Sequence, residues 1–319
     1  MKKEESPEYL TSQIITYIGN KRHLLGSIEA EVLQLKKDLG KRQLACADLF
    51  SGSGIVARML KRHSSRLIVN DLESYSAMLN ACYLTNRKDF PEAEWERCRA
   101  RIEAEFECAP VKGILSAHYA PADDAHIQKG ERVFYTRENA VRIDSYRSLT
   151  DRFADPDLRK FFIAPLLTEA SIHVNTSGVF KGFYKDKTTG IGCFGGAGRN
   201  ALPRILGRVE LKKPVLSAFS SRFEIFQEDA RSLASRLKGL DLAYLDPPYN
   251  QHPYGSNYFM LNLIVRNSLD APLSEVSGIP QNWNRSAFNR AKDALASLEG
   301  IVSSIGARCL IVSYNSEGF

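Results

Sequence analysis

Continuous apolar runs constrain the fold of this chain more than any other feature of its sequence. They lie at residues 44–50, 66–71, 240–245 and 308–314. Runs that are apolar throughout are typical of strands buried on both faces of a parallel sheet. Amphipathic helical patterns separate them, at residues 54–63, 74–85, 229–237 and 287–305. Strands that alternate with helices predict an α/β fold with a parallel sheet and crossover helices.

The middle of the chain breaks this alternation. Residues 87–109 are highly charged and predict a helix, and residues 176–207 hold 8 of the 21 glycines. We therefore predict one α/β domain, formed by residues 1–84 and 223–319. An insertion, residues 85–222, interrupts it.

Positive charge is concentrated within this insertion. The whole chain carries 43 Lys and Arg against 37 Asp and Glu, a net charge of +6. Residues 181–213 alone hold 8 basic and 2 acidic side chains. A concentrated basic segment favours a polyanionic partner such as nucleic acid. Charge alone leaves a second interpretation open, a solvated basic face without a partner.

The cysteines and the N-terminus indicate the compartment. No two of the six cysteines have the spacing of a CxxC motif, and no histidine lies near enough to complete a zinc pattern. We predict reduced thiols and no metal site. The polar N-terminus and the lack of any apolar run of membrane-spanning length predict a soluble cytoplasmic protein.

The first chemical motif is a glycine turn, Asp48-Leu-Phe-Ser-Gly-Ser-Gly54, where a predicted strand ends and a helix begins. Glycine allows a tight turn and close approach of a ligand to the backbone, and the helix presents free N–H groups. Asp71 closes the next strand, where an acid accepts hydrogen bonds from ribose hydroxyls. The set favours an adenosine-containing cofactor; the alternative is a tight turn without a ligand.

A second glycine pattern has the wrong context. Gly190-Ile-Gly-Cys-Phe-Gly195 matches G-x-G-x-x-G, but the polar residues 185–189 before it do not predict a buried strand. A dinucleotide site requires that strand. We interpret this segment as a basic, glycine-rich loop that can approach a phosphate backbone.

The strongest motif is Asp246-Pro-Pro-Tyr249, directly after the strand at 240–245. Two prolines stiffen the backbone, so the Asp246 carboxylate and the Pro247 carbonyl can accept hydrogen bonds at one spot beside the Tyr249 ring. Ligands of open α/β sheets bind at this end of the strands. The arrangement suits an exocyclic amine on a planar base, whose lone pair is then directed at an electrophile. The alternative is a proline turn that merely ends a strand.

With these motifs, residues 17–319 resemble a DNA adenine-N6 methyltransferase of the alpha motif order, as found in restriction–modification systems. The resemblance implies a Rossmann-like sheet that binds S-adenosylmethionine, with the insertion as target-recognition domain. It also implies methyl transfer to the N6 amine of an adenine flipped out of double-stranded DNA.

The resemblance assigns a role to each motif. Cofactor binding falls to Tyr17, Gly19, Asn20, Lys21, Asp48, Phe50, Ser51, Gly52, Ser53, Gly54, Asp71 and Asp229. Catalysis falls to Asp246, Pro247, Pro248 and Tyr249. Candidate DNA contacts are Lys181, Lys185, Lys187, Arg199 and Arg204 on the insertion, with Tyr254, Asn257 and Tyr258 around the flipped base.

The end of the sequence and the catalytic motif leave other partners and functions open. The family's sheet usually continues past residues 313–318 into a hairpin, whereas this sequence ends at Phe319. Candidate partners are therefore a chain that completes the sheet and a cognate restriction endonuclease, and one alternative is an inactive or split DNA-binding subunit. A second alternative is an RNA adenine methyltransferase. A third alternative is a methyltransferase of protein glutamine side chains. The motif of those enzymes resembles Asn-Pro-Pro-Tyr, so Asp246 argues against this alternative.

Overall fold

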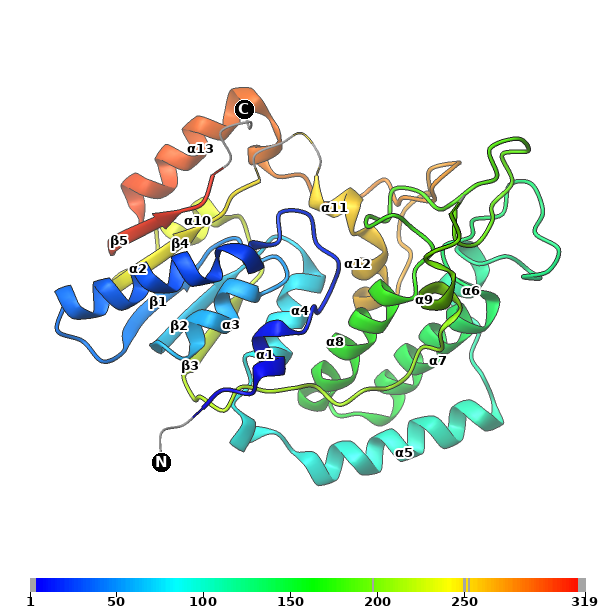
Figure 1. Ribbon diagram of the computed structural model, residues 1–319, viewed down its shortest axis with the longest axis horizontal. Coiled ribbons are helices and arrows are strands. Elements are labelled where there is room, and N and C mark those ends of the chain that lie inside the picture. The colour runs from blue at the N-terminus through cyan, green and yellow to red at the C-terminus, as the bar shows by residue number, and fades with distance from the viewer. Residues whose placement is uncertain (1–3, 197, 249–250, 252, 315–319) are drawn as a thin grey trace.

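The computed structural model describes residues 4–196, 198–248, 251 and 253–314. Within these residues a five-stranded sheet has the order β3-β2-β1-β4-β5, and every neighbouring pair is parallel (Figure 1). The strands are β1 (Leu44–Asp48), β2 (Ser64–Asn70), β3 (Arg222–Phe226), β4 (Leu240–Leu245) and β5 (Ala307–Val312). The predicted α/β fold with a parallel sheet is confirmed.

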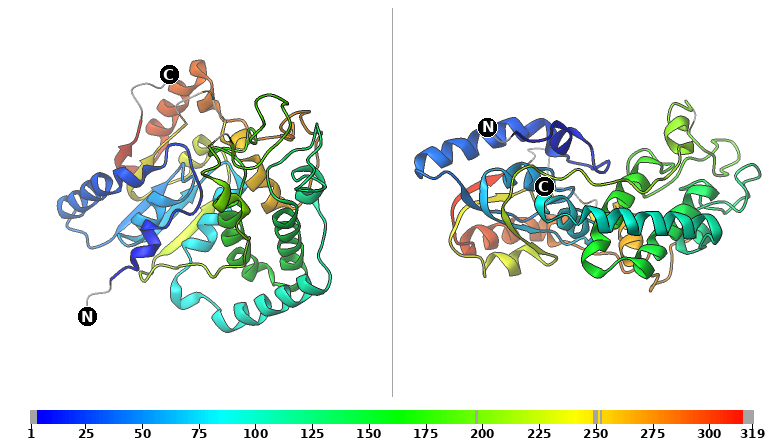
Figure 2. Two further views of the ribbon diagram at one scale, coloured as in Figure 1. Left: turned by 45° about the vertical axis from the view of Figure 1, so that its right-hand side comes forward. Right: turned by 90° about the horizontal axis from the view of Figure 1, so that it is seen from below.

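Helices cover both faces of the sheet, which explains why the central strands carry apolar side chains on both faces. Leu44 and Cys46 of β1 pack in one core with α2 (Leu25–Asp38) and α3 (Ile55–Lys61). Their neighbour Ala47 packs in the opposite core, with α10 (Ala230–Ala234) and α13 (Ala291–Ser304). Successive side chains of a strand point to opposite faces, so both sets must be apolar. Figure 2 shows α2 and α13 on opposite sides of the strands.

Two predicted elements are shorter in the structure. The strand predicted at 44–50 ends at Asp48, and the helix predicted at 229–237 is reduced to α10. Asp229 caps α10 by accepting hydrogen bonds from the backbone N–H groups of Arg231 and Ser232. Strand β3 was not predicted, because this edge strand is only half-buried and carries charged Arg222 and Glu224 among its apolar residues.

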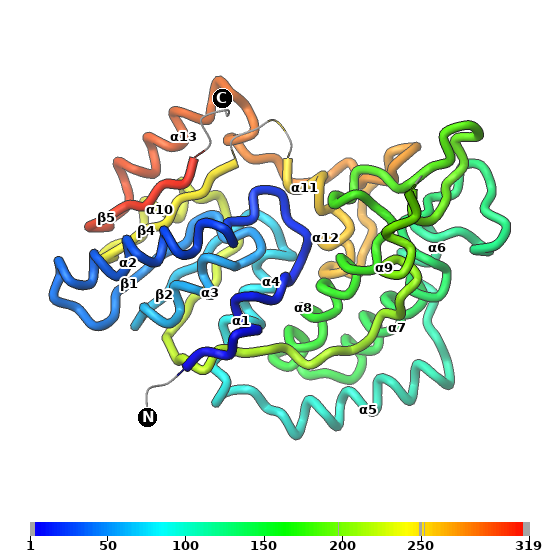
Figure 3. The backbone as a smooth tube through the Cα atoms, in the orientation of Figure 1, coloured from blue at the N-terminus to red at the C-terminus, as the bar shows by residue number. Residues whose placement is uncertain are grey.

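A helical lobe with its own core lies beside the sheet (Figures 1 and 3). Its helices are α4 (Ser74–Tyr83), α5 (Glu92–Cys108), α7 (Arg137–Phe153), α8 (Pro156–Ile172) and α12 (Phe259–Arg266). Only α4 and α5 were predicted; α8 is buried almost all round, so it lacks the amphipathic pattern that identifies a surface helix. Helix α12 follows β4 in the chain and yet contacts α4, α7 and α8. The lobe therefore draws on chain from both sides of β4.

The remaining elements are short. They are α1 (Pro7–Thr11), η1 (Lys21–Leu24), η2 (Arg87–Asp89), α6 (Ile114–His118), α9 (Leu202–Leu206), α11 (Tyr254–Asn257) and η3 (Ala287–Asn289). No helix in the described part of the chain is long and apolar enough to cross a membrane. All six cysteines are free thiols, and the described residues contain no group of three or more His, Cys, Asp or Glu side chains that could hold a metal ion.

Candidate active site

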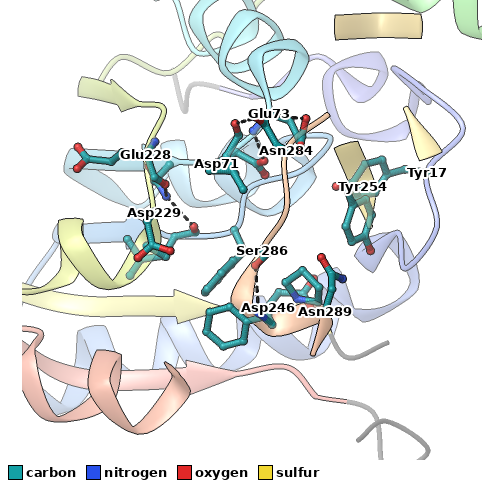
Figure 4. Close-up of a pocket in the computed structure, with 17 residues that line it drawn as sticks. Tyr17, Asp71, Glu73, Glu228, Asp229, Asp246, Tyr254, Asn284, Ser286 and Asn289 are labelled. Carbon is teal, nitrogen blue, oxygen red and sulfur yellow. Dashed lines mark hydrogen bonds between the residues drawn. The ribbon is translucent and has the colours of Figure 1, made fainter. Parts of the chain in front are cut away.

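The carboxyl ends of the parallel strands open into one cavity of about 680 Å³ (Figure 4). Residues just after β1, β2, β3 and β4 line it, because parallel strands all end at the same edge of the sheet. Strand order reverses between the neighbours β1 and β4, which is where open α/β sheets bind ligands. Of the predicted site residues, those that line the cavity are Tyr17, Phe50, Asp71, Asp229, Asp246, Pro248 and Tyr254.

The glycine turn after β1 has the backbone that only glycine adopts easily. Gly52 and Gly54 have φ angles of +52° and +76°. The Gly52 N–H donates to Asp71 Oδ2 over 2.7 Å, and the Glu73 N–H donates to Asp71 Oδ1 over 2.9 Å. A Cβ atom on Gly52 would lie 2.7 Å from the Tyr17 ring. The turn therefore orients Asp71 and brings Tyr17 close to the backbone.

The other predicted residues of this motif do not line the cavity. Ser51 is buried against α4, where its hydroxyl lies 3.1 Å from that of Ser76. Ser53 is buried, and Gly54 forms the N-cap of α3. Asp48 is fully buried at the end of β1; burial first and the neighbouring Asp246 second raise its pKa to about 8. These residues therefore support the turn without lining the cavity.

Asp246 forms an ion pair with the N-terminal motif. Lys21 Nζ lies 2.7 Å from Asp246 Oδ2 and 2.8 Å from the Gly19 carbonyl oxygen. The second oxygen, Asp246 Oδ1, is buried and has no hydrogen-bond partner among the described residues. Burial raises the pKa of Asp246 to about 6, and Lys21 opposes that rise. Nearby Asn20 caps η1 by accepting from the Arg22 N–H, so it supports the turn that carries Lys21.

Three tyrosines stack beside this ion pair. The Tyr17 ring stacks with both Tyr254 and Tyr258, with centroid distances of 5.1 Å and 5.0 Å, and Tyr254 and Tyr258 stack with each other at 6.0 Å. The Tyr258 hydroxyl accepts from the Ile18 N–H, and the Tyr254 hydroxyl donates to the Ile18 carbonyl. Tyr258 and Asn257 are buried, so of these predicted base contacts Tyr254 alone reaches the cavity. The stack holds the chain just before Gly19 and Lys21.

The predicted basic residues lie apart from the cavity, on the helical lobe. Lys185, Lys187 and Arg199 are exposed and Lys181 is half-buried, all on the loops before α9. Arg204 is different, because its guanidinium donates to the carbonyls of Ile172, Val174 and Thr176 just after α8. It holds the lobe together. The segment at 190–195 contains no strand and opens no helix, in agreement with its interpretation as a loop.

Sequence reasoning missed several lining residues. They include Glu73 and four residues of one segment, Asn284, Ser286, Phe288 and Asn289. Phe288 packs edge-on against Phe50, with ring centroids 5.1 Å apart. The segment contains no motif, and only Ser286 before the helical pattern at 287–305 signalled a structured start. Tyr249, the last residue of the catalytic motif, lies outside the described residues.

The parallel sheet, the glycine turn and the acidic strand ends are consistent with the methyltransferase class of α/β enzymes. Residues 17–273 match the family model of the D12 class N6 adenine-specific DNA methyltransferases, and the chain belongs to this family. It is therefore a site-specific adenine methyltransferase of DNA, as the motifs predicted.

Relatives agree over nearly the whole chain. The Type II methyltransferase M.NlaIII of Neisseria lactamica is 29% identical over 309 residues, covering 95% of this chain and 84% of that protein. The Type II methyltransferase M.CviAII of Paramecium bursaria Chlorella virus 1 is 28% identical, with the same coverage. M.FokI of Planomicrobium okeanokoites is 26% identical, but the match spans 44% of its length.

Proposed function

We propose that this enzyme takes its methyl group from S-adenosylmethionine and transfers it to an adenine rotated out of the DNA duplex. The supporting observation is that one cavity joins two kinds of wall. One wall has the acids Asp71 and Asp229 with the apolar Phe50 and Phe288, which suit a ribose and an adenine ring. The other has Asp246 and Tyr254, which suit the target amine and its base.

When bound, S-adenosylmethionine supplies an electrophilic methyl group on a positively charged sulfur. In the proposed mechanism Asp246 Oδ1 accepts one N–H of the target amine and the Pro247 carbonyl accepts the other. Lys21 holds Oδ2, so the remaining oxygen is left for the substrate. The amine lone pair would form the new N–C bond while the S–C electron pair stays on sulfur. The surplus N6 proton would pass to water after the methyl group has arrived, so no base with a tuned pKa is needed before attack.

The predicted division of the chain follows from the same proposal. Residues 1–84 and 223–319 would bind the cofactor and the reacting amine, and residues 85–222 would recognise the DNA. Because α12 packs with α7 and α8, we propose that chain after β4 supports the recognition lobe as well. A cytoplasmic location, a cognate endonuclease and a chain that completes the sheet beside edge strand β5 remain predictions.

Incubation of the purified protein with tritiated S-adenosylmethionine and mixed-sequence duplex DNA tests the function. We expect label on adenine N6 in duplex DNA, with little on RNA of the same sequence. Normal cofactor binding without label would support the inactive-subunit alternative. Mapping of methylated adenines in cells that express the chain identifies the target sequence.

The pH dependence of kcat/KM tests the Lys21–Asp246 pair. The Asp246 pKa is about 6, so protonation below that pH removes the ion pair and the negative acceptor. We expect kcat/KM to fall roughly tenfold per pH unit below 6 and to be flat from 7 to 8. Steady-state assays between pH 5 and 8 measure this.

Two variants assign the acid limb to this carboxylate. Lys21→Met removes the charge that lowers the Asp246 pKa, so the limb should move to higher pH. Lys21→Arg keeps the charge and should leave the limb near 6. A limb at the same pH in the wild type and the Met variant would show that another group titrates.

The triple change of Lys181, Lys185 and Lys187 to Gln tests whether the loops before α9 bind DNA. We expect DNA affinity to fall roughly tenfold or more and the slope of log K against log salt to flatten by about 1–3, since each lost phosphate contact removes nearly one unit. Fluorescence anisotropy at several salt concentrations measures both. The matched control changes three exposed lysines outside the helical lobe to Gln. They are Lys37, Lys238 and Lys292. Equal slopes for the two triple variants would place the DNA surface elsewhere.

A further inference from the structure

A buried carboxylate in the cavity wall takes no part in the mechanism above. Glu73 is only 3% exposed, although it lines the cavity and lies two residues after Asp71. It is the N-cap residue of α4, but its side chain makes no capping hydrogen bond. Burial of a carboxylate without hydrogen-bond partners would cost free energy of folding. The partners of Glu73 therefore indicate its role.

Glu73 joins three separate parts of the chain. Its Oε2 atom accepts from Asn262 Nδ2 over 2.6 Å and from Asn284 Nδ2 over 3.2 Å. Asn262 belongs to α12, and Asn284 begins the cavity-lining segment, residues 284–289. One carboxylate oxygen therefore ties the start of α4 to α12 and to this segment. Figure 4 shows Glu73 and Asn284 side by side in the cavity wall.

Both amides are held in the orientation that presents N–H groups to Glu73. Asn262 Oδ1 accepts from the Ser74 hydroxyl over 2.7 Å and from the Tyr75 N–H over 3.1 Å. Asn284 Nδ2 also donates to the Leu72 carbonyl over 3.1 Å. An oxygen at position 73 is thus required as acceptor, because both partners can only donate there.

The surroundings leave no space for a looser arrangement. A Cβ atom on Gly255 would lie 2.6 Å from the Asn284 carbonyl oxygen and 3.1 Å from Glu73 Oε1. Among the charged neighbours, Asp71 raises the pKa of Glu73 and Arg266 lowers it, and burial brings it to about 7. The junction is close-packed, and the hydrogen bonds from the two amides oppose the rise in the Glu73 pKa that burial causes.

The 284–289 segment forms a large part of the cavity wall. It contributes Asn284, Ser286, Phe288 and Asn289. At its far end Phe288 is 3% exposed and packs against Phe50. At its near end the Asn284 side chain donates to Glu73 and to the Leu72 carbonyl. Loss of the Glu73 contact therefore loosens one end of the wall and leaves the other in place.

We propose that Glu73 is a positioning residue that, through Asn284 and Asn262, fixes the 284–289 segment as the wall against which the methyl donor binds. The identity of the donor rests on the proposed function, but the fixing of the segment does not. Glu73 touches no reacting atom in this role. Its removal should weaken donor binding more than it slows transfer.

Trp283 provides a direct probe of the segment. The chain has two tryptophans, and the other, Trp95, is 1% exposed inside the helical lobe. Trp283 is half-buried and adjacent to Asn284, so acrylamide quenching of tryptophan fluorescence reports on the segment. A Trp283→Phe variant supplies the Trp95 signal to be subtracted.

In Glu73→Ala we expect the quenching constant of Trp283 to rise about twofold and the Kd for S-adenosylmethionine, from equilibrium dialysis, to rise about tenfold. The kcat at saturating donor should fall less than threefold. Glu73→Gln keeps an oxygen acceptor of the same size and should restore most of both values. Asn284→Ala removes a hydrogen-bond partner of Glu73. Because Asn284 is only half-buried, this variant should fold, and its quenching constant and Kd should match those of Glu73→Ala.

The matched control is Asn282→Ala, an exposed neighbour with no hydrogen bond to Glu73 among the described residues; it should behave as wild type. Unchanged quenching in both Glu73→Ala and Asn284→Ala would overturn the proposal, as would equal defects in Glu73→Gln and Glu73→Ala. If wild-type protein does not bind S-adenosylmethionine, the proposed function fails, whereas the quenching comparison still decides the role of Glu73.

Discussion

Asp246→Ala is expected to lower kcat roughly 10²–10³-fold, the loss typical of removing a group that stabilises developing charge. The variant loses the Oδ1 acceptor at the point where the target amine would gain positive charge. It also leaves Lys21 without its 2.7 Å partner. Cofactor affinity should change little, because Asp71 and the glycine turn remain. Single-turnover methylation and equilibrium dialysis separate the two effects.

Asp241→Ala is the matched control on the same strand. Asp241 lies at the opposite end of β4, is 3% exposed and pairs with Lys41 over 2.7 Å. Its loss should lower the melting temperature and leave kcat per folded molecule near the wild-type value. Near-normal turnover in Asp246→Ala, or an equal loss in both variants, would refute the assigned catalytic role.

Gly52→Ala should have the largest effect on cofactor binding. The new Cβ would lie 2.7–2.8 Å from two ring carbons and the hydroxyl oxygen of Tyr17, so either this side chain or the turn must move. A moved turn weakens the hydrogen bond from the Gly52 N–H to Asp71. Loss of a hydrogen bond to a charged group costs about 1.5–3 kcal/mol. We therefore expect the Kd for S-adenosylmethionine to rise roughly 10- to 100-fold.

Gly40→Ala separates this clash from the cost of the backbone conformation. Gly40 has φ +63°, close to the +52° of Gly52, but nothing lies within 4 Å of a Cβ placed there. It should lose about 1–2 kcal/mol of stability, as a left-handed residue does, and bind cofactor normally. Equal cofactor affinity in Gly52→Ala and Gly40→Ala would show that the contact between Tyr17 and the turn has no functional weight.

The sheet was predictable because its central strands are buried on both faces. That environment demands unbroken apolar runs, and β1, β2 and β4 all carry them within a few residues of the predicted bounds. Strand β3 lies at the edge of the sheet and has a neighbouring strand on one side only. It is half-buried, so charged residues are tolerated there and the apolar run that would predict a strand is missing. In the same way, the buried helix α8 has no polar face to reveal its period.

Motifs located the strand ends of the site for a related reason. A turn that needs left-handed glycines, or an acid followed by two prolines, restricts residue type at successive positions of one short segment. Gly52, Gly54 and Asp246 are recognisable from their immediate neighbours alone. The family model that matches residues 17–273 confirms the activity which those motifs predicted.

Contacts across long sequence separations were decided only by the tertiary structure. Lys21 and Asp246 are 225 positions apart in the printed numbering, and their 2.7 Å ion pair exists because the turn before α2 packs over the end of β4. Glu73 reaches Asn262 and Asn284 across 189 and 211 positions. The residues themselves are ordinary, and neither amide has a neighbour in sequence that marks it.

The sequence by itself therefore determined the parallel sheet, the glycine turn and the Asp-Pro-Pro corner after β4, because burial and backbone geometry restrict residues locally. Only the tertiary structure decided which side chains share the cavity: that Tyr258 and Asn257 are buried, that Arg204 closes a helix end, and that segment 284–289 forms a wall. The physical reason is that a hydrogen bond or an ion pair depends on distance in space. The sequence records only distance along the chain.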